Sequence, residues 1–384
     1  MIRQTVATIS LSAIQDNLRL IRDLLARESA LASTAAGGAT APAPPGVIAV
    51  VKANAYGHGA TAVGPALAEA GASMLACADI EEGVSLREAG VDIPILVFGA
   101  LSVSDLDGVF EHRLTPTVST PAAARALEQI AARRDVRLRC HLKIDTGMNR
   151  LGFRHDNLRR TMPAVLGSRH LDFDAVYTHF ATADDPESPF LDQQRRRFEQ
   201  ALAALGAMGL RTPRRHAANS AALLRDTRTW GDWVRPGLLI YGIVPPPLSA
   251  DLGLRPALSL TSRIVAVKGV RAGEGTSYGL KWHAEGPRTI AIVPAGYADG
   301  LDTRMSGRAF VLVRGLRMPV VGAVCMDMMM VDVTGLDVSP GDEVVIIGRQ
   351  GELEITAREV AAAIGTIPWE VVCRLGSRIE RRYA

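Results

Sequence analysis

The chain has 384 residues, which at about 150 residues per domain allows two or three domains, and we expect two. With 48% hydrophobic and 22% charged residues it can build a sizeable core, which excludes global disorder. The 43 lysines and arginines nearly balance the 40 aspartates and glutamates. The basic clusters at 195–197 and 378–382 are short and lie among acidic residues, so nucleic-acid binding is not expected.

The cysteines and the apolar runs exclude further classes of protein. The four cysteines are far apart, with no Cys-x-x-Cys pair and no histidine at zinc-ligand spacing, which argues against a disulfide scaffold or a metal site. Residues 1–25 lack the apolar stretch and cleavage site of a signal peptide, and no run approaches about 18 apolar residues. We therefore expect a cytoplasmic protein that does not associate with membranes.

The first predicted element is an amphipathic helix. Apolar residues recur at spacings of three and four between residues 11 and 25. From Ser33 to Gly46 the chain contains only Ser, Thr, Ala, Gly and Pro, which bury too little apolar surface to offset the entropy of ordering. We expect a flexible surface insertion, which we place at residues 29–46.

Short apolar runs and helical patterns then alternate along the chain. The expected helices include 60–70, 81–89, 121–132 and 191–208. The expected strands are Val47–Val51, Met74–Ala78, Ile95–Phe98, Thr115–Val118, Leu138–Ile144, Ala175–Thr178, Arg215–Ala218 and Val234–Tyr241. Eight strand and helix units of this kind favour a TIM (β/α)8 barrel, while a doubly wound open sheet would use similar elements.

The pattern of residues changes after Pro245–Pro247. Short β-branched runs separated by turn residues follow, as in an antiparallel β-domain: Leu258–Val270, Thr289–Val293, Ala309–Val313, Val320–Val324, Met330–Val333 and Glu343–Ile347. The predicted fold is therefore α/β, an N-terminal TIM barrel followed by a C-terminal, mainly antiparallel β-domain. We place the domains at 1–246 and 247–384, and allow that the first few residues pair with the second domain.

Lys52 is the first residue with the right position for chemistry. In VVKANAYGHG it directly follows an apolar strand, at the end of the barrel where active sites lie. A lysine that its neighbours partly desolvate there has a lowered pKa and can attack a carbonyl to form a Schiff base. A lone lysine after a strand is more often simply solvated, so the other polar residues decide.

Those residues end other strands of the same barrel. Arg150, His179, Asn219, Ser220 and Arg235 all lie after or near the end of strands five to eight, and all are predicted at one rim. Each alone has an ordinary structural explanation, but five at one mouth indicate a site. The hydroxyl of Ser220 and the backbone N–H groups of Gly237 and Leu238 form a predicted phosphate site. A Schiff-base lysine beside one phosphate site points to pyridoxal phosphate.

The sequence resembles the bacterial alanine racemases, which are pyridoxal-phosphate enzymes with a barrel and a C-terminal β-domain. VVKANAYGHG resembles their cofactor-lysine signature at almost every position. KIDTGMNRLGF, RPGLLIYG, TSYGLKW, PAGYADG and GAVCMDM are similar to further family segments, in the family's order. The resemblance covers nearly the whole chain.

The resemblance implies roles around the cofactor. Lys52 would carry pyridoxal phosphate, and Arg235 would face its pyridine nitrogen. Because arginine keeps its proton, it leaves this nitrogen unprotonated, which favours quick reprotonation at Cα. The remaining cofactor-binding residues would be Tyr56, Asn219, Ser220, Gly237 and Leu238.

The resemblance also implies two bases and a homodimer. Lys52 would serve one face of the substrate and Tyr278 the other, and in the family His179 and Arg235 form a hydrogen-bonded chain to that tyrosine. In the family the second domain reaches the partner's barrel in a head-to-tail dimer. The residues implied to bind alanine there are Arg150, Tyr297, Cys325, Met326 and Asp327.

Two positions leave questions open. Lys143 resembles a lysine that is carbamylated in some relatives, and the alternative is an unmodified lysine in a salt bridge. Ser377 stands where some relatives have a tyrosine near the phosphate, which puts one phosphate contact in doubt.

The predicted function is interconversion of L-alanine and D-alanine, which supplies D-alanine for peptidoglycan. A broad-specificity amino acid racemase and a non-catalytic pyridoxal-phosphate-binding protein are the alternatives. A fold-related decarboxylase would pair the ring nitrogen with a carboxylate, and Arg235 argues against it.

Overall fold

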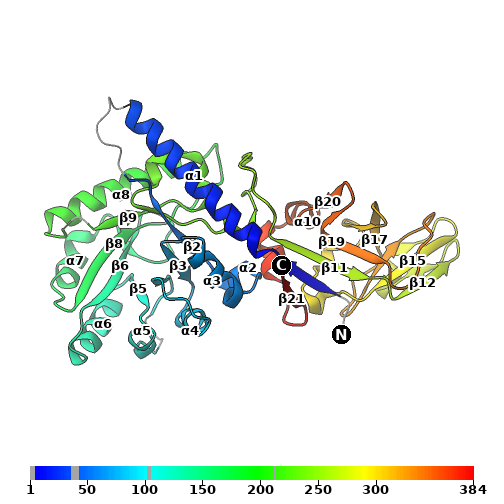
Figure 1. The fold of residues 1–384 in the computed structure, drawn as a ribbon, viewed down its shortest axis with the longest axis horizontal. Helices are drawn as coiled ribbons and strands as arrows, with labels where there is room; N and C mark the ends of the chain where they lie inside the picture. The colour runs from blue at the N-terminus through cyan, green and yellow to red at the C-terminus, as the bar shows by residue number, and fades with distance from the viewer. Residues whose placement is uncertain (1–4, 36–42, 102–104, 212) are drawn as a thin grey trace.

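The computed structural model describes residues 5–35, 43–101, 105–211 and 213–384. Figure 1 shows an elongated molecule with one sheet toward each end, and helix α1 (Leu11–Ala35) running from the junction across the first of them. The C-terminus lies at this junction, beside the start of α1. The start of α1 and the C-terminus therefore meet near the middle of the molecule, where the N–H of Leu11 donates to the carbonyl of Ala384 (3.0 Å).

The first sheet is a nearly closed parallel barrel. Its strand order is β10-β2-β3-β4-β5-β6-β8-β9, and a backbone bridge between Asn219 and Arg235 brings the two ends together. The strands are β2 (Gly46–Val50), β3 (Met74–Cys77), β4 (Ile95–Val97), β5 (Thr115–Val118), β6 (Leu138–Asp145), β8 (Leu171–Tyr177), β9 (Arg214–His216) and β10 (Trp233–Val234), with β7 (Phe153–Arg154) beside β6. The predicted barrel is confirmed, and the open doubly wound sheet is wrong.

The predicted eighth strand, Val234–Tyr241, is mostly wrong. Only Trp233 and Val234 form a strand, and the 3-10 helix η2 (Leu238–Tyr241) replaces the rest. All four side chains of η2 are buried. A short run that is apolar on every side has the same sequence signature in a strand and in a buried helical turn, so its pattern alone does not separate them.

Helices surround the barrel. They are α3 (Ala60–Glu69), α4 (Ile80–Glu88), α5 (Asp107–Glu111), α6 (Pro121–Arg133), α7 (Leu158–Leu166), α8 (Phe190–Ala207), α9 (Ser220–Arg225) and the 3-10 turn η1 (Thr227–Thr229). Helix α1 packs on α3 and η2, where the amide of Asn17 donates to the carbonyls of Ile240 (3.0 Å) and Arg255 (2.8 Å). This buried amide fixes the long helix against the closing turn of the barrel.

The insertion predicted at residues 29–46 is too long. Helix α1 continues to Ala35, and β2 begins at Gly46. Alanine-rich and polar residues propagate a helix that has already begun, because each further residue adds a hydrogen bond without a new nucleus. Residues 36–42 lie outside the described residues.

The second sheet is mainly antiparallel. Its order is β12-β15-β18-β17-β16-β19-β11-β1-β21, with β20 on β19, and only the β1–β21 pair is parallel. The strands are β1 (Val6–Ile9), β11 (Leu258–Arg263), β12 (Ala266–Val270), β15 (Arg288–Val293), β16 (Phe310–Val313), β17 (Leu316–Val321), β18 (Met329–Asp332), β19 (Glu343–Gln350), β20 (Leu353–Ile355) and β21 (Glu380–Tyr383). The N-terminal strand β1 thus lies in the sheet of the C-terminal half.

Several elements of this half were not predicted. The single strand expected at Leu258–Val270 is two strands, β11 and β12, which lie far apart in the sheet order. The others are α10 (Ala357–Ile364), α11 (Pro368–Cys373), the hairpin of β13 (Gly275–Thr276) and β14 (Trp282–His283), and the 3-10 turns η3 (Tyr278–Leu280), η4 (Tyr297–Asp299) and η5 (Thr303–Met305).

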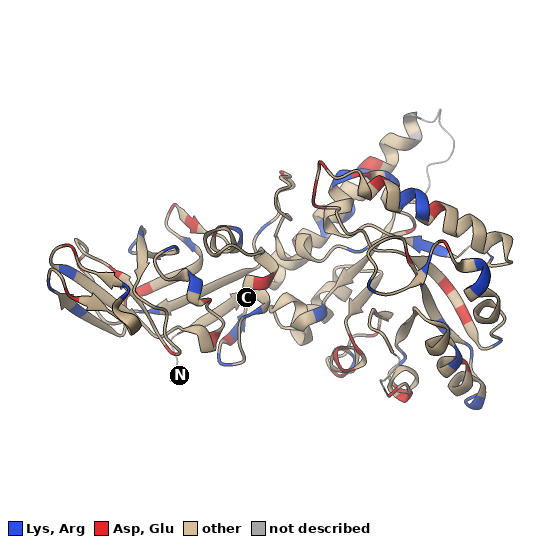
Figure 2. Ribbon diagram, turned by 180° about the vertical axis from the view of Figure 1, so that it is seen from behind, with Lys and Arg blue, Asp and Glu red and all other residues tan. Residues whose placement is uncertain are grey.

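Charges are spread over both halves of the molecule. In Figure 2 basic and acidic positions are interspersed along the helices and turns instead of gathering on one face. The charge pattern therefore shows no single basic surface.

None of the helices in the described ranges combines the length and the apolar character that a membrane crossing requires.

Candidate functional site

Lys52 opens an unusual turn at the end of β2. The short element α2 (Lys52–Tyr56) has left-handed backbone angles, with φ of 52° to 54° at Ala53, Asn54, Ala55 and Tyr56. For residues other than glycine this conformation costs about 1–2 kcal/mol each, so it persists only where surrounding contacts hold it. The strained turn therefore marks this segment as one that the fold actively maintains.

Glu82 on α4 supplies those contacts. Its Oε1 accepts hydrogen bonds from the backbone N–H of Ala53 (2.6 Å) and Asn54 (3.4 Å), and its Oε2 accepts one from Ala78 (2.8 Å). Sequence reasoning missed Glu82. The available signal was the Asp-x-x-Glu start of the helix, where Asp79 caps the N–H of Glu82 (2.9 Å) and leaves the glutamate side chain near the strand ends.

Lys52 itself is partly buried at the barrel mouth. Burial is the main cause that lowers the pKa of its ammonium, and the nearby charge of Arg150 lowers it further. A lysine whose neutral form is favoured in this way is a nucleophile and a base at a lower pH than a solvated lysine. The environment that the sequence predicted for Lys52 is present.

The predicted phosphate residues come together around Gly237. Its backbone N–H donates to Oγ of Ser220 (3.0 Å). A Cβ built on Gly237 would lie 2.6 Å from the hydroxyl oxygen of Tyr56, so only glycine allows this approach. Leu238 begins η2 directly after it, and Asn219 caps α9 by accepting from the N–H of Ala222 (3.0 Å). The structure therefore assembles a small group of hydroxyl and N–H groups from three separate segments.

Arg235 is buried at 2% exposure in the barrel and has only neutral partners. Its guanidinium donates to Nδ1 of His216 (2.8 Å), to Nδ1 of His179 (3.3 Å) and to two backbone carbonyls, those of Thr178 (2.8 Å) and Ala217 (2.9 Å). Burial lowers the pKa of Arg235 to about 10, which leaves it charged at neutral pH. Among the described residues no carboxylate forms an ion pair with it, so a full positive charge is left without an anion.

A buried chain of two histidines continues from Arg235, and sequence reasoning missed it. Because the guanidinium only donates, Nδ1 of His216 accepts, and the neutral ring then donates from Nε2 to Nδ1 of His141 (3.0 Å). Burial lowers the pKa of His141 to about 3, which keeps it neutral. The chain fixes both tautomers, and the only sequence signal was that His216 precedes the Asn219–Ser220 pair.

Lys143 and Arg150 add two more cations to this mouth. Lys143 is buried on β6, and burial followed by the charge of Arg150 lowers its pKa to about 8. Arg150 is exposed in the loop after β6 and has no ion-pair partner within the described part of the chain. The salt bridge expected for an unmodified Lys143 is not among the ion pairs of the described residues. The mouth thus holds several positive groups and few negative ones.

The remaining predicted site residues form a second group, on the C-terminal half. Oγ of Ser277, the neighbour of Tyr278, lies 3.2 Å from Sγ of Cys325, and the N–H of Tyr297 donates to the carbonyl of Cys325 (2.9 Å). The exposed fractions are 77% for Tyr278, 45% for Tyr297 and 52% for Met326. The structure therefore gathers these residues into one exposed patch.

The patch includes Asp327, which forms an ion pair with Arg378 (2.6 Å), next to Ser377. No hydrogen bond or ion pair joins Tyr278 to Lys52 or Arg235 within the described residues. Tyr278 lies in the chain between β12 and β15, which Figure 1 shows at the far end of the molecule from the barrel. One chain therefore builds two half-sites and does not bring them together.

Comparison with protein families gives two matches that together span both sheets. The family model described as alanine racemase, N-terminal domain, matches residues 9–245. The model described as alanine racemase, C-terminal domain, matches residues 257–383. Between them they include every residue of the two half-sites.

Individual relatives agree over the full length. An alanine racemase from Symbiobacterium thermophilum is 41% identical over 99% of this chain and 97% of its own. One from Methanococcus maripaludis is 37% identical over 98% of both chains. Among solved structures, alanine racemase from Streptomyces lavendulae has a TM-score of 0.92 at 35% identity, covering 100% of this chain and 98% of its own. That from Bacillus anthracis with bound L-Ala-P has a TM-score of 0.89 at 34% identity, covering 100% and 96%.

Proposed function

This chain belongs to the alanine racemase family, and we propose that it interconverts L-alanine and D-alanine with pyridoxal phosphate, using one base from each half-site. It is an isomerase of that family, and its matched relatives bear the name alanine racemase. They do not favour a broad-specificity racemase, a pyridoxal-phosphate-binding protein without turnover or a decarboxylase. A location in the cytoplasm and a role in supplying D-alanine for peptidoglycan stay predictions.

The residues at the barrel mouth fit pyridoxal phosphate. Tyr56, Ser220, Gly237 and Leu238 would hold the phosphate, because their hydroxyl and N–H groups converge where Gly237 leaves room that a Cβ would fill. Arg235 would face the ring nitrogen, since it is a fixed donor that forms no ion pair with a carboxylate of the described residues. When bound, the cofactor supplies a carbonyl that condenses with amines and a ring that withdraws electrons from Cα.

The geometry around Arg235 is the observation that carries this proposal. A buried arginine with four neutral partners keeps its proton, and the His216–His141 chain holds it in place. A donor that does not release its proton prevents full protonation of an opposing ring nitrogen. This limits how far charge leaves Cα, which favours return of a proton to Cα over longer-lived side reactions.

Racemisation requires proton removal on one face of Cα and delivery on the other. Lys52 would act on one face, because burial lowers the pKa of its amine and so favours the neutral form that accepts a proton. Tyr278 would act on the opposite face through its phenolic oxygen. The guanidinium of Arg150, which forms no ion pair with a carboxylate of the described residues, would bind the carboxylate of alanine, assisted by the backbone N–H of Met326.

The two half-sites imply a homodimer in which each barrel mouth receives the exposed patch of the partner subunit. The support is that Tyr278, Tyr297, Cys325, Met326 and Asp327 share one patch whose large side chains are solvent-exposed in the single chain. Exposed aromatic and methionine side chains of this kind are typical of interfaces. Each active site would then need both subunits.

Lys143 is proposed to carry a carbamate. An amine must be neutral to react with carbon dioxide, and the pKa of about 8 makes a substantial neutral fraction available near physiological pH. The resulting anion would lie among Arg150, Arg235 and Lys52, whose charges all act on Lys143 or its neighbours. Carbon-13 NMR of protein equilibrated with labelled bicarbonate should show a carbamate signal that is missing in Lys143→Met.

The experiment that tests the function follows two signals at once. Cofactor-loaded protein is incubated with L-alanine in heavy water while optical rotation and the α-proton NMR signal are recorded. We expect both signals to decay together, because each turnover inverts Cα and introduces solvent deuterium. Loss of neither signal would refute the proposed reaction.

Tyr278→Phe tests the assignment of the second base. The variant removes only the hydroxyl from an exposed side chain, so folding should be unaffected. Racemisation should fall by about 10²–10⁴-fold, and α-proton exchange should survive better for D-alanine than for L-alanine, since Lys52 remains. Equal loss of exchange from both enantiomers would assign the second proton to another group.

A further inference from the structure

Two loops of the C-terminal half meet beneath the exposed patch. In the loop that forms η4, the N–H of Tyr297 donates to the carbonyl of Cys325 (2.9 Å). The N–H of Ala298 donates to the carbonyl of Met326 (3.0 Å). A Cβ built on Gly296 would lie 2.3 Å from the carbonyl oxygen of Cys325, so glycine allows the two loops to approach this closely. The position of Met326 therefore depends on the turn that contains Tyr297.

These contacts fix the direction of one backbone donor. The carbonyl of Cys325 and the N–H of Met326 belong to one trans peptide group, so they point to opposite sides of the chain. Because the carbonyl faces Tyr297, the N–H of Met326 points away from η4. No hydrogen bond among the described residues uses this N–H, and Met326 is 52% exposed. The turn thus presents an oriented and unused donor on the exposed patch.

Arg378 contacts both loops. Its Nη2 lies 2.6 Å from Oδ1 of Asp327, the residue after Met326, and its Nε lies 3.5 Å from Oδ1 of Asp299, the last residue of η4. Asp299 is 1% exposed, and its Oδ2 accepts from the N–H of Gly296 (2.9 Å). One guanidinium therefore faces a carboxylate on each of the loops that set the direction of the Met326 N–H.

The setting of Arg378 differs from that of an ordinary surface ion pair. Exposed pairs usually contribute little, because solvent screens them and both side chains must be ordered. Here one of the two carboxylates is buried, and the N–H of Gly376 donates to the carbonyl of Asp299 (3.1 Å), which ties the backbone before Arg378 to the same turn. Loss of the guanidinium should therefore change how the two loops lie against each other.

We propose that Arg378 is a positioning residue for the carboxylate of alanine. By joining Asp299 and Asp327, it keeps the N–H of Met326 directed toward the barrel mouth of the partner subunit, where this N–H assists Arg150. It also balances the charge of Asp327, which would otherwise repel a carboxylate bound beside it. The proposal rests on the proposed function and deepens it, since Arg378 acts through other residues and does not touch the substrate.

Three ligands separate the carboxylate site from the rest of the active site. Propionate has the carboxylate of alanine without its amine, ethylamine has the amine without the carboxylate, and alanine has both. Arg378→Met should weaken propionate binding and raise the KM for L-alanine by about tenfold, the usual effect of losing one hydrogen bond to a charged group. The kcat should change by less than about threefold, and ethylamine affinity, followed by cofactor absorbance, by less than about twofold, because neither depends on carboxylate binding alone.

Two further variants make the test specific. Arg378→Lys keeps the charge but replaces the planar fork with one ammonium, so propionate affinity should fall by only about threefold. Arg349→Met is the matched control, because it removes an exposed arginine of the same half that pairs with Glu354 (3.1 Å). It should leave the affinities for propionate and ethylamine and the KM unchanged. Light scattering of each variant measures whether it stays a dimer at the assay concentration.

Several results would overturn the proposal. They are unchanged propionate affinity in Arg378→Met, an equal fall in the affinities for propionate and ethylamine, and a variant that is monomeric under the assay conditions, since the arginine would then act on assembly. If Arg378→Met does not fold, equal propionate affinities of Arg378→Lys and the wild type would overturn it as well.

The failure of this proposal is distinguishable from the failure of the proposed function. Propionate binding is measured without turnover, so it reports on the carboxylate site whether or not the wild-type protein racemises alanine. The proposed reaction is tested separately, by the exchange of the α-proton and the loss of optical rotation in heavy water.

Discussion

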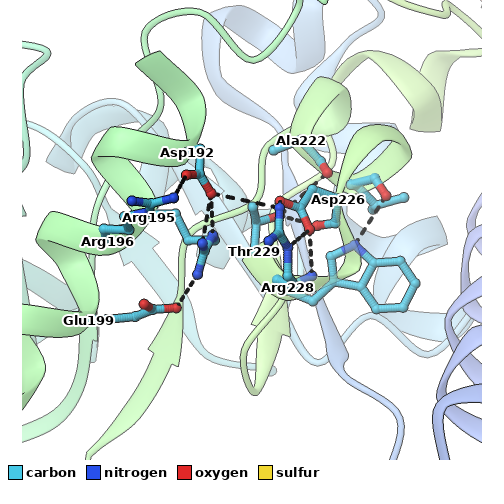
Figure 3. Close-up of polar contacts among 10 residues, drawn as sticks. Asp192, Arg195, Arg196, Glu199, Ala222, Asp226, Arg228 and Thr229 are labelled. Carbon is cyan, nitrogen blue, oxygen red and sulfur yellow. Dashed lines mark hydrogen bonds and ion pairs between the residues drawn. The ribbon is translucent and has the colours of Figure 1, made fainter. Parts of the chain in front are cut away.

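Two groups of charged residues in the barrel half are built on opposite principles. In a surface network on α8 and η1 three arginines face carboxylates: Arg195 lies 2.7 Å from Asp192 and 2.6 Å from Glu199, Arg196 lies 2.8 Å from Asp192, and Arg228 lies 2.8 Å from Asp226 (Figure 3). Inside the barrel mouth Arg235 donates only to neutral histidines and carbonyls. In the surface network the arginine charges are balanced by carboxylates, whereas the charge of the interior arginine is not balanced by any carboxylate of the described residues.

The difference shows what each group can do. Exposed pairs are screened by solvent and salt, so they orient helices at little energetic gain and leave no charge for a ligand. A buried cation without an anion is costly in isolation. The fold keeps Arg235, Lys143 and the exposed Arg150 in one place, and none of the three forms an ion pair with a carboxylate in the described ranges. This arrangement favours anionic groups that arrive from outside, such as a carbamate, a phosphate or a substrate carboxylate.

Replacing the interior arginine should have the largest effect. Arg235→Met keeps the length of the side chain and removes all donors, so the ring nitrogen of the cofactor loses its fixed partner. We expect turnover with L-alanine to fall by about 10²–10³-fold, the usual loss when a preorganised donor is removed. Initial rates of racemisation by circular dichroism measure this.

The control is the same substitution in the surface network. Arg228→Met removes an arginine that pairs with Asp226 on the surface, and turnover should stay within twofold of wild type. If both variants lose activity equally, general destabilisation explains the loss. If neither does, the charge of Arg235 has no part in the reaction.

The low pKa of Lys143 predicts a pH dependence of stability. Below pH 8 the amine is protonated in the folded and unfolded states, so it contributes no slope. Between pH 8 and 10.5 the folded state has lost a proton that the unfolded state still holds, so the free energy of unfolding should rise, by roughly 3 kcal/mol in all. Urea unfolding in buffer free of carbon dioxide measures this rise.

Lys143→Met isolates the contribution of this one amine. The variant has no group to titrate at this position. The free energy of unfolding of the wild type should therefore rise relative to that of the variant between pH 8 and 10.5. Parallel curves over that range would mean that Lys143 titrates near its ordinary pKa. Bicarbonate should reduce the difference, because carbamate formation removes the amine.

The sequence predicted the barrel well because its strands have a simple physical signature. All residues of β3 and β4 are buried, so each appears as a short continuous apolar run between turn residues. The same signature was misleading at Leu238–Tyr241, where a buried 3-10 turn is equally apolar. The helices α10 and α11 are short and lie among strands, so the sequence has no long helical periodicity there that would predict them.

For the site, sequence reasoning found groups attached to strand ends and missed those that act through distant contacts. Lys52 and Arg235 lie next to recognisable strands, and their motifs are specific. Glu82 contacts Ala53 across 29 positions, and His216 contacts His141 across 75, so no local pattern reveals either pair. Such partners are defined by tertiary packing alone.

Glu82 is a third case beside the paired surface arginines and the unpaired interior cations. It is a carboxylate near Lys52, and it accepts hydrogen bonds from backbone N–H groups. Glu82→Gln keeps one acceptor oxygen but turns an N–H₂ group toward donors, so the left-handed turn should lose about 1–3 kcal/mol of stability. The pKa of Lys52 should also fall further, since the charge of Glu82 raises it. Cofactor capture followed against pH would show the shift.

Glu81→Gln is the matched control for that variant. Glu81 lies in the same first turn of α4 and is exposed, and among the described residues no hydrogen bond or ion pair joins it to α2. It should leave cofactor capture and its pH profile unchanged. A shift of equal size in both variants would trace the effect to the helix charge of α4 instead of the turn.

The smallest effect is expected in the surface network. Asp192 lies 2.7 Å from Arg195, 2.8 Å from Arg196 and 3.7 Å from Arg228, and the hydrogen bond from Arg195 lowers the pKa of its carboxyl. Asp192→Asn leaves three arginines close together, so the midpoint of unfolding should fall slightly at low ionic strength. At about 1 M salt, where charges are screened within about 3 Å, the variant and the wild type should unfold together. Because the interior cations lie away from bulk solvent, Arg235→Met should keep its full loss of turnover at the same salt concentration, and a loss that also disappeared would remove the distinction between the two groups.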